Sequence, residues 1–385
     1  MSRGRDDLVE RVRRRMAELP ECAVDGRGQA ETARIIREEA GVISDVQVLE
    51  VLRRLRHEST GVGPLEHLLA IDGVTDVVVN GSGAVWFDTG DGMHRADETF
   101  TSDAEVRTLA TRLAALCGRR LDDAHPFADG RMCRADGTAV RVHALLSPPA
   151  EEGTCISLRV LRQATLGLDA LAARGAVSPE IAELLRSIVR SRRSLLVVGG
   201  TGSGKTTLLS ALLAEVPHRE RIVCIEDTAE LHPPHPHVIN LVARQANAEG
   251  IGEITMSDLL RQALRMRPDR IVVGEIRGAE VVDLLTALNT GHDGGAGTVH
   301  ANSLAELPAR FEALGALGGL GRTALHSQLA AALRVVVSVR RSPSGQRRVH
   351  QIGVLEGNPV TVVPVWDAGS GELGGFGALR ESVGA

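Results

Sequence analysis

A chain of 385 residues is long enough for two or three domains, and its hydrophobic share of 43% and charged share of 24% exclude a disordered protein. The net charge of −5 excludes a global basic field for nucleic acid or anionic lipid, and an aromatic share of 2% leaves few side chains for stacking on bases. No apolar run is long enough to span a bilayer and the charged N-terminus lacks a signal-peptide core, so we expect a cytoplasmic protein.

Residues 1–60 are charged and helical in pattern. Leu8, Val12 and Met16 recur at four-residue spacing, and a second apolar series follows at residues 48–55. This pattern predicts an N-terminal helical segment that caps the next domain. The arginine-rich stretch at residues 11–15 is either a solvated face or a docking arm for a partner.

Short strands separated by turns begin at Gly61. A β-branched run at residues 75–80 and a second strand at residues 84–88 predict a hairpin. A helix then runs to Leu116, and further hairpins follow. We therefore predict an α+β domain with an antiparallel sheet over residues 61–162.

Three arginines of this region lie beside or within predicted strands: Arg131, Arg141 and Arg159. On spacing alone they are arginines on an exposed sheet face that alternate with apolar neighbours. A functional role would require a phosphate nearby, because guanidinium binds phosphate through a bidentate fork.

A linker and a helix occupy residues 163–193. Ser178 can cap the helix, Pro179 is tolerated in its first turn, and Glu180 suits the positive end of its dipole. Apolar residues at three- and four-residue spacing give this helix one buried face. An apolar strand is predicted after this helix, at residues 195–198.

A phosphate-binding loop follows that strand, since residues 199–206 spell G-x-x-x-x-G-K-T before an apolar helical run. Its glycines let the backbone wrap tightly and direct N–H groups at a β-phosphate. We expect Lys205 to reach the β- and γ-phosphates and the Thr206 hydroxyl to bind Mg²⁺. A glycine-rich turn that happens to carry a lysine is the alternative. The residues expected to bind nucleotide are Gly199, Gly200, Thr201, Gly202, Ser203, Gly204, Lys205, Thr206 and Thr207.

Strands and helices alternate after Pro217. The predicted strands lie at residues 221–225, 238–242 and 270–274, and the predicted helices at residues 255–267 and 279–289. This alternation predicts an α/β domain with a mainly parallel sheet covered on both faces, over residues 194–366.

The end of the chain changes pattern again. A final hairpin is predicted from residues 335–339 and 349–355, with its turn at Ser344 and Gly345. Residues 367–385 are rich in Gly and Ala and are predicted to form a flexible C-terminal tail.

Acidic residues follow two of the predicted strands. Glu226 and Asp227 come after the strand that ends at Ile225, and Glu275 follows the strand that includes Val273. Carboxyl ends of parallel strands open onto the same crevice as the phosphate loop, so these groups can converge on the γ-phosphate. The alternative is that they are capping or turn carboxylates.

Histidines give a less specific signal. His300 ends a third predicted strand, where a satisfied, partly buried histidine is the alternative to a site residue. His232, His235 and His237 could form a metal-binding tract, but the prolines among them make a rigid loop the better interpretation.

Further stretches resemble the motifs of a known family. Residues 225–231 resemble its aspartate box, residues 267–280 its second acidic motif, and residues 290–302 its histidine box. Together with the phosphate loop, they are similar to the secretion ATPases of the type II/type IV superfamily. Residues 61–66 and 74–81 most resemble the branch that serves Tad-type pili.

The resemblance covers about residues 45–360. It implies a RecA-like P-loop ATPase domain preceded by a PAS-like α+β domain. It also implies ATP and Mg²⁺ as ligands, with Thr206, Glu226 and Glu275 around the metal.

The resemblance assigns roles to particular residues. Glu275 would be the catalytic or water-polarising carboxylate, and His300 would sense the γ-phosphate. Arg131 and Arg141 match arginines of the family's N-terminal domain that reach toward phosphate, and Arg159 is a weaker match.

By resemblance, the chain is a hexameric motor whose Mg²⁺-dependent ATP hydrolysis powers Tad-type pilus assembly or type II-like protein secretion. Such a motor docks on an inner-membrane platform protein and lies at the inner face of the plasma membrane. No direct contact with nucleic acid is expected. A conjugation ATPase that assists DNA transfer and a nucleotide-bound scaffold without turnover are the alternatives.

Some relatives carry a four-cysteine zinc insertion. The cysteines of this chain are scattered and never paired as C-x-x-C: Cys22, Cys117, Cys133, Cys155 and Cys224. We therefore expect reduced thiols and no structural zinc.

Overall fold

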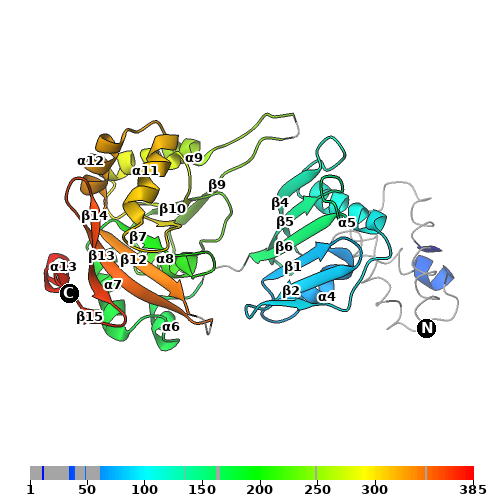
Figure 1. Cartoon of the computed structure of the whole chain (residues 1–385), viewed down its shortest axis with the longest axis horizontal. Coiled ribbons are helices and arrows are strands. Elements are labelled where there is room, and N and C mark those ends of the chain that lie inside the picture. Colours follow the sequence, from blue (N-terminus) through cyan, green and yellow to red (C-terminus); the bar gives the residue numbers. More distant parts are fainter. Residues whose placement is uncertain are drawn as a thin grey trace. The chain divides into compact units, whose positions relative to one another are not determined.

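The computed structural model describes residues 11–12, 34–39, 48, 61–134, 136–161, 165–247, 249–342 and 345–385. The chain divides into two compact units, Met1–Leu161 and Arg162–Ala385, which are described separately (Figure 1). The predicted helical segment over residues 1–60 lies mostly outside the described residues, as does Ser344 of the predicted turn. Among the residues that are described, no helix is long and apolar enough to cross a membrane.

The first unit is built on a six-stranded sheet in the order β3-β2-β1-β6-β5-β4, and each neighbouring pair is antiparallel. Helix α5 begins after Ser102, whose side chain accepts the Glu105 N–H, and buries Val106, Leu109 and Leu113 in the core of this unit. The elements are η1 (Gly63–Leu65), α4 (Glu66–Leu69), β1 (Asp76–Asn80), β2 (Ala84–Asp88), β3 (Met93–Arg95), α5 (Asp103–Leu116), β4 (Phe127–Cys133), β5 (Ala139–Leu145) and β6 (Cys155–Leu161).

The second unit is built on a nine-stranded sheet in the order β15-β14-β13-β12-β7-β11-β10-β8-β9. The pairings from β9 to β12 are parallel, whereas β13, β14 and β15 add an antiparallel edge. The elements are α6 (Leu168–Ala173), α7 (Pro179–Arg190), β7 (Leu195–Val198), α8 (Lys205–Leu213), β8 (Ile222–Glu226), β9 (Val238–Val242), α9 (Met256–Ala263), β10 (Arg270–Ile276), α10 (Glu280–Asn289), β11 (Ala296–Val299), α11 (Leu307–Leu317), α12 (Arg322–Ala332), β12 (Val335–Arg341), β13 (Arg347–Glu356), β14 (Thr361–Asp367), β15 (Gly371–Glu372) and α13 (Phe376–Val383).

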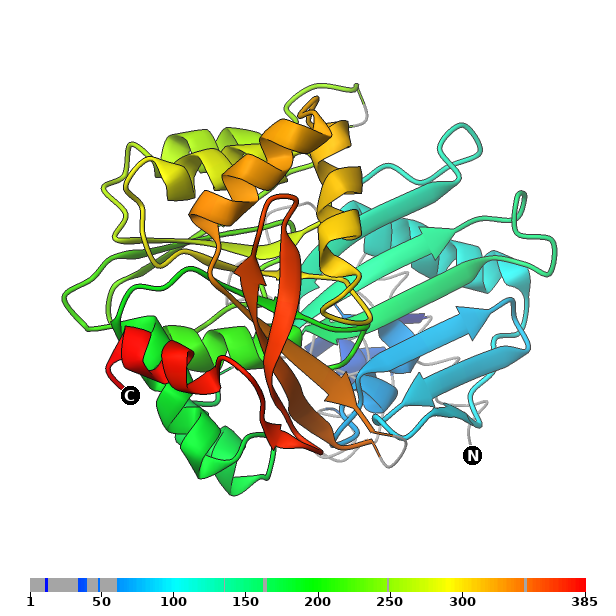
Figure 2. The ribbon, with the colours of Figure 1, turned by 60° about the vertical axis from the view of Figure 1, so that its left-hand side comes forward.

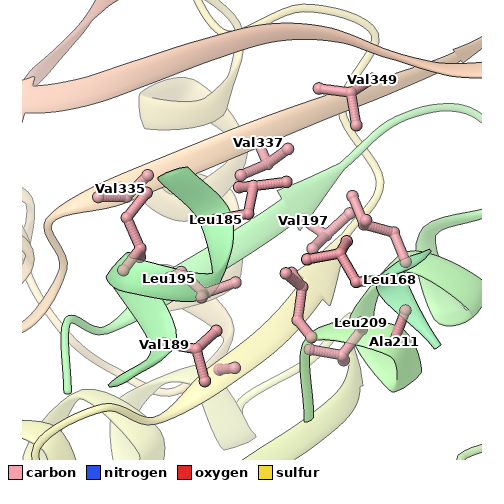
Figure 3. Packing of buried hydrophobic residues seen from close by; sticks show 14 of the residues in the cluster. Leu168, Leu185, Val189, Leu195, Val197, Leu209, Ala211, Val335, Val337 and Val349 are labelled. Atoms are coloured by element: carbon pink, nitrogen blue, oxygen red, sulfur yellow. The ribbon is translucent and has the colours of Figure 1, made fainter. Parts of the chain in front are cut away.

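Helices cover both faces of this sheet because its central strands are apolar on both sides. In β7, Leu195 and Val197 belong to the core cluster that includes residues of α6, α7, α8 and α13. Leu196 and Val198 belong to the cluster that includes residues of α9, α10, α11 and α12. Figure 2 shows the two helix layers on either side of the sheet, and Figure 3 shows the first cluster around Leu195 and Val197.

The prediction of a flexible tail over residues 367–385 is wrong. β15 pairs with β14, and α13 buries Phe376, Leu379 and Val383 in the cluster that also contains α7. Arg193, which follows α7, donates to a carbonyl oxygen of α13 at 2.9 Å. The Gly- and Ala-rich composition of the tail favours flexibility. The spacing of its apolar side chains, however, gives a helix one buried face.

The anchoring of α13 can be tested at Phe376, which is 1% exposed. Phe376→Ala is expected to lower the free energy of unfolding by about 3–5 kcal/mol, because it leaves a cavity in the core. Chemical denaturation followed by circular dichroism measures the change. Leu373→Ala is the control, since Leu373 is 37% exposed and should contribute little. An unfolding midpoint for Phe376→Ala equal to that of the wild type would show that α13 is not anchored.

Candidate nucleotide-binding site

The loop of residues 199–206 connects β7 to α8, which begins at Lys205. A Cβ atom on Gly199 would lie 2.4 Å from the Val339 carbonyl oxygen, and Gly204 has a φ of 96°, which side chains disfavour. Both positions therefore require glycine. The loop ends at the N-terminus of α8, where free N–H groups and the helix dipole attract an anion such as phosphate.

The side chain of Lys205 is buried against this loop. Its Nζ donates to the carbonyl oxygens of Gly199 and Gly200 at 3.1 and 2.9 Å. Burial lowers the pKa of Lys205, and nearby carboxylates act in the opposite direction. The loop thus holds the ammonium where it can exchange carbonyl partners for phosphate oxygens.

His300, the residue after β11, joins Lys205 to Glu275. Its Nδ1 lies 3.4 Å from Lys205 Nζ, and its Nε2 lies 3.1 Å from Glu275 Oε1. A neutral ring with the proton on Nε2 satisfies both contacts, because Nε2 donates to the carboxylate and Nδ1 accepts from the ammonium. Burial lowers the pKa of His300, and cations that include Lys205 lower it further, which favours this neutral form.

Glu275 is the last residue but one of β10, and its side chain is 30% exposed. The register of β10 with β11 shifts between Val273 and Ile276, so Glu275 lies at an irregular point of the ladder. The Thr298 hydroxyl donates to the Gly274 carbonyl oxygen at 2.6 Å and fixes the adjoining backbone. The carboxylate of Glu275 is therefore held at the neutral ring while it remains accessible to water.

Two glutamates of the segment at the end of β8 have different surroundings. Glu226 is 3% exposed, and its carboxylate accepts the N–H groups of Glu230 and Leu231. Glu230 Oε2, in contrast, accepts the Thr206 hydroxyl at 3.4 Å. The Glu226 carboxylate therefore stabilises the conformation of the segment after β8. In this conformation Glu230 lies beside Thr206.

Glu230 was not predicted, because only carboxylates at strand ends were expected to approach the phosphates. The signal available in the sequence was a second glutamate within residues 225–231. Its position beside Thr206 depends on how the chain folds back after β8. The ligand roles expected for Glu226 and Glu275 stay predictions.

The residues around Thr206 fit a bound Mg²⁺. Thr206 and Glu230 offer hydroxyl and carboxylate oxygens, which are the ligands that this ion prefers. Mg²⁺ keeps several of its waters in such sites and needs few protein ligands. No group of three or more His, Cys, Asp and Glu side chains that could hold an ion occurs in the described part of the chain.

An ion pair between Arg277 and Asp227 links the segments that follow β8 and β10. Glu280, at the start of α10, accepts the N–H groups of Arg277 and Gly278 at 2.7 and 2.8 Å. The ion pair joins the two segments that carry the acidic residues of the site, and the Glu280 carboxylate satisfies backbone N–H groups in the segment after β10.

Arg131, Arg141 and Arg159 lie in the first unit, as neighbours across β4, β5 and β6. Arg131 is opposite Arg141, Arg141 is opposite Arg159, and all three are exposed, so they share one face of the sheet. Arg159 donates to Asp76 at 2.8 Å, and Arg141 donates to Asp129 at 3.5 Å. The reach of Arg131 and Arg141 toward phosphate stays a prediction.

A strand that enters a glycine-rich loop, and a helix that begins at the loop lysine, define the class of this molecule as a P-loop nucleotide-binding protein. Within that class the chain belongs to the Type II/IV secretion system protein family, whose model matches residues 58–352.

Individual relatives agree with this membership. The chain is 58% identical over 345 residues to a putative conjugal transfer protein of Mycobacterium tuberculosis (strain CDC 1551 / Oshkosh), covering 88% of this chain and 98% of the relative. It is 31% identical over 288 residues to the conjugal transfer protein TrbB of Rhizobium radiobacter, covering 74% and 84%. The solved structure of the pilus retraction motor PilT with bound ADP matches with a TM-score of 0.56 at 20% identity, covering 84% of this chain and 86% of that chain, which shows a shared fold.

Proposed function

We propose that this chain is a Mg²⁺-dependent ATPase that works as the motor of a secretion or pilus apparatus. The observation that carries the proposal is the contact series from Lys205 through His300 to Glu275. Binding a nucleotide requires only the loop and its lysine, whereas hydrolysis also requires a group that orients water at the γ-phosphate. A carboxylate held beside the lysine supplies that group, and membership in a family of secretion ATPases supports the same function.

Each residue of the series has a distinct task in this reaction. Lys205 and the loop N–H groups bind the β- and γ-phosphates and offset the charge that develops on them. Glu275 orients the attacking water and accepts its proton. Neutral His300 keeps the carboxylate in place through Nε2, and its contact with Lys205 makes it responsive to the phosphate. Bound Mg²⁺, held by Thr206 and Glu230, would neutralise the phosphate oxygens.

The finer features of the proposal come from the family resemblance. We infer a hexameric ring, with a PAS-like first unit and a RecA-like second unit, that docks on an inner-membrane platform protein at the cytoplasmic face and serves a Tad-type pilus or type II-like secretion. Arg131 and Arg141 would contact phosphate through their guanidinium forks, so withdrawing them would couple hydrolysis to movement. Analytical ultracentrifugation with and without nucleotide tests the ring, and a monomer under both conditions would contradict it.

Turnover is the direct test of the proposed function. The purified chain should release phosphate from ATP when Mg²⁺ is present and stop when the metal is chelated. Binding of ATP without turnover, in the presence and absence of membrane vesicles, would favour a scaffold in place of a motor.

A second candidate is the assistance of DNA transfer, which is favoured by relatives described as conjugal transfer proteins. The chemistry at the P-loop would be the same and the cargo different. Titrating DNA into the ATPase assay distinguishes a DNA cargo from a protein cargo. Stimulation that weakens as the salt concentration rises would favour DNA, and unchanged turnover would favour a protein cargo.

Glu226 and Glu230 are expected to respond differently to the same substitution. Glu230→Gln should raise the Mg²⁺ concentration needed for half-maximal turnover, because a neutral amide is a weaker ligand than a carboxylate. Glu226→Gln should instead lower the free energy of unfolding by about 1–3 kcal/mol, because its buried carboxylate accepts two backbone N–H groups. Mg²⁺ titrations and chemical denaturation measure both effects. A changed Mg²⁺ dependence in Glu226→Gln alone would assign the ligand role to Glu226.

A further inference from the structure

An open pocket lies beside the phosphate loop, within the second unit. Ser203 of the loop and Thr207 of α8 form part of its wall, and Val177 and Val349 make other parts of the wall apolar. Val349 is also part of the cluster drawn in Figure 3. Arg347 and Arg348, the first two residues of β13, add charged side chains to the lining.

The position of this pocket suits the base and ribose of a nucleotide. The terminal phosphates are expected at Lys205, which contacts His300 and does not line the pocket. Thr207 does line it, next in the chain to Thr206, the residue that would hold the metal. A polyphosphate chain bound along the loop therefore leads toward the pocket, whose apolar walls would bury the faces of a base.

The side chain of Arg347 lies against the loop itself. Its Nε donates to the Gly202 carbonyl oxygen at 2.8 Å, and its Cδ lies 3.2 Å from the position of a Cβ atom on Gly204. The peptide group that carries the Gly202 oxygen carries the Ser203 N–H on its opposite edge. Holding the oxygen from outside therefore fixes the direction of one N–H group of the loop before a phosphate arrives.

We propose that Arg347 is a positioning residue for nucleotide binding, which holds the phosphate loop in its binding conformation through the Gly202 carbonyl. The inference rests on the proposed function, since it assumes that the loop binds nucleotide. Its neighbour Arg348 donates to the Gln346 side chain instead. Because Arg347 contacts a carbonyl oxygen of the loop, it acts on nucleotide affinity and not on the chemical step.

Binding of ADP and of inorganic tripolyphosphate to the full chain, measured by isothermal titration calorimetry, tests this role. Arg347→Ala is expected to weaken both ligands about tenfold, as loss of one charge-assisted hydrogen bond predicts, and to raise KM for ATP with kcat unchanged. Arg347→Lys keeps a charge and a donor and should give an intermediate affinity. Arg340→Ala is the matched control, because Arg340 is an exposed arginine of the same hairpin that does not line the pocket.

The outcomes separate the alternatives. Weaker ADP binding with unchanged tripolyphosphate binding would overturn the positioning role, because it would confine Arg347 to a contact with the base. Equal affinities of Arg347→Ala and the wild type would overturn the inference as well. If Arg347→Ala fails to fold, wild-type affinity in a folded Arg347→Met variant would overturn it. ADP binding by the wild type without ATP turnover would contradict only the proposed function, and a wild type that binds neither ligand would contradict both.

Discussion

Lys205→Ala is expected to abolish ATP turnover and to weaken nucleotide binding by roughly a hundredfold or more. Each charge-assisted hydrogen bond to a phosphate oxygen contributes about 1.5–3 kcal/mol, and this ammonium is placed to reach two phosphates. Its hydrogen-bond partners are two carbonyl oxygens and a neutral imidazole, and the nearby carboxylates of Glu230 and Glu275 keep other partners when the ammonium is removed. The fold should therefore persist while binding, measured by calorimetry, is lost.

A chemical test of the same assignment is available because Lys205 is the only lysine in the sequence. An amine-acylating reagent can therefore modify a single lysine, and its extent of reaction is measured by mass spectrometry of the peptide that contains residue 205. We expect ADP to protect Lys205 from acylation, since its phosphates would cover the amine. Full turnover by Lys205→Ala, or acylation that ADP does not slow, would show that the phosphate loop is misassigned.

Glu275→Gln is expected to lower the rate of ATP hydrolysis by about 10²- to 10⁴-fold and to leave ATP affinity within a few-fold of the wild type. The amide has the shape of the carboxylate, and its carbonyl oxygen can still accept the proton of His300 Nε2. It cannot take a proton from water, which is the task assigned to Glu275. Single-turnover phosphate release measures the loss, and equilibrium binding measures the affinity.

The chain offers a closely matched control for this substitution. Glu312 accepts a hydrogen bond from His326 Nε2 at 2.9 Å and is 31% exposed, compared with 3.1 Å and 30% for the pair of His300 and Glu275. Glu312→Gln changes the same kind of carboxylate–histidine pair on α11 and α12 and should leave turnover unchanged. A wild-type rate in Glu275→Gln would remove this residue from the catalytic assignment.

The parts of the fold that could be predicted are those that local sequence determines. The phosphate loop requires a strand, glycines at close contacts, a lysine and a helix start, and all of these lie within residues 195–213. Helix α13 was mispredicted because its stability depends on packing against α7, which is far away in the sequence, and not on its own helix propensity. The same holds for β15, a two-residue strand that forms by pairing with β14.

By itself, the sequence determined the phosphate loop and the acidic and histidine residues that were candidates for its surroundings. Periodicity places a residue at a strand end or on a helix face, but a hydrogen bond requires positions to within a fraction of an ångström. Only the tertiary structure decided that His300 lies between Lys205 and Glu275, although His300 and Lys205 are 95 positions apart. It also decided that the Glu226 carboxylate accepts backbone N–H groups, whereas the Glu230 carboxylate accepts the Thr206 hydroxyl. These partners depend on how the chain folds back after β8.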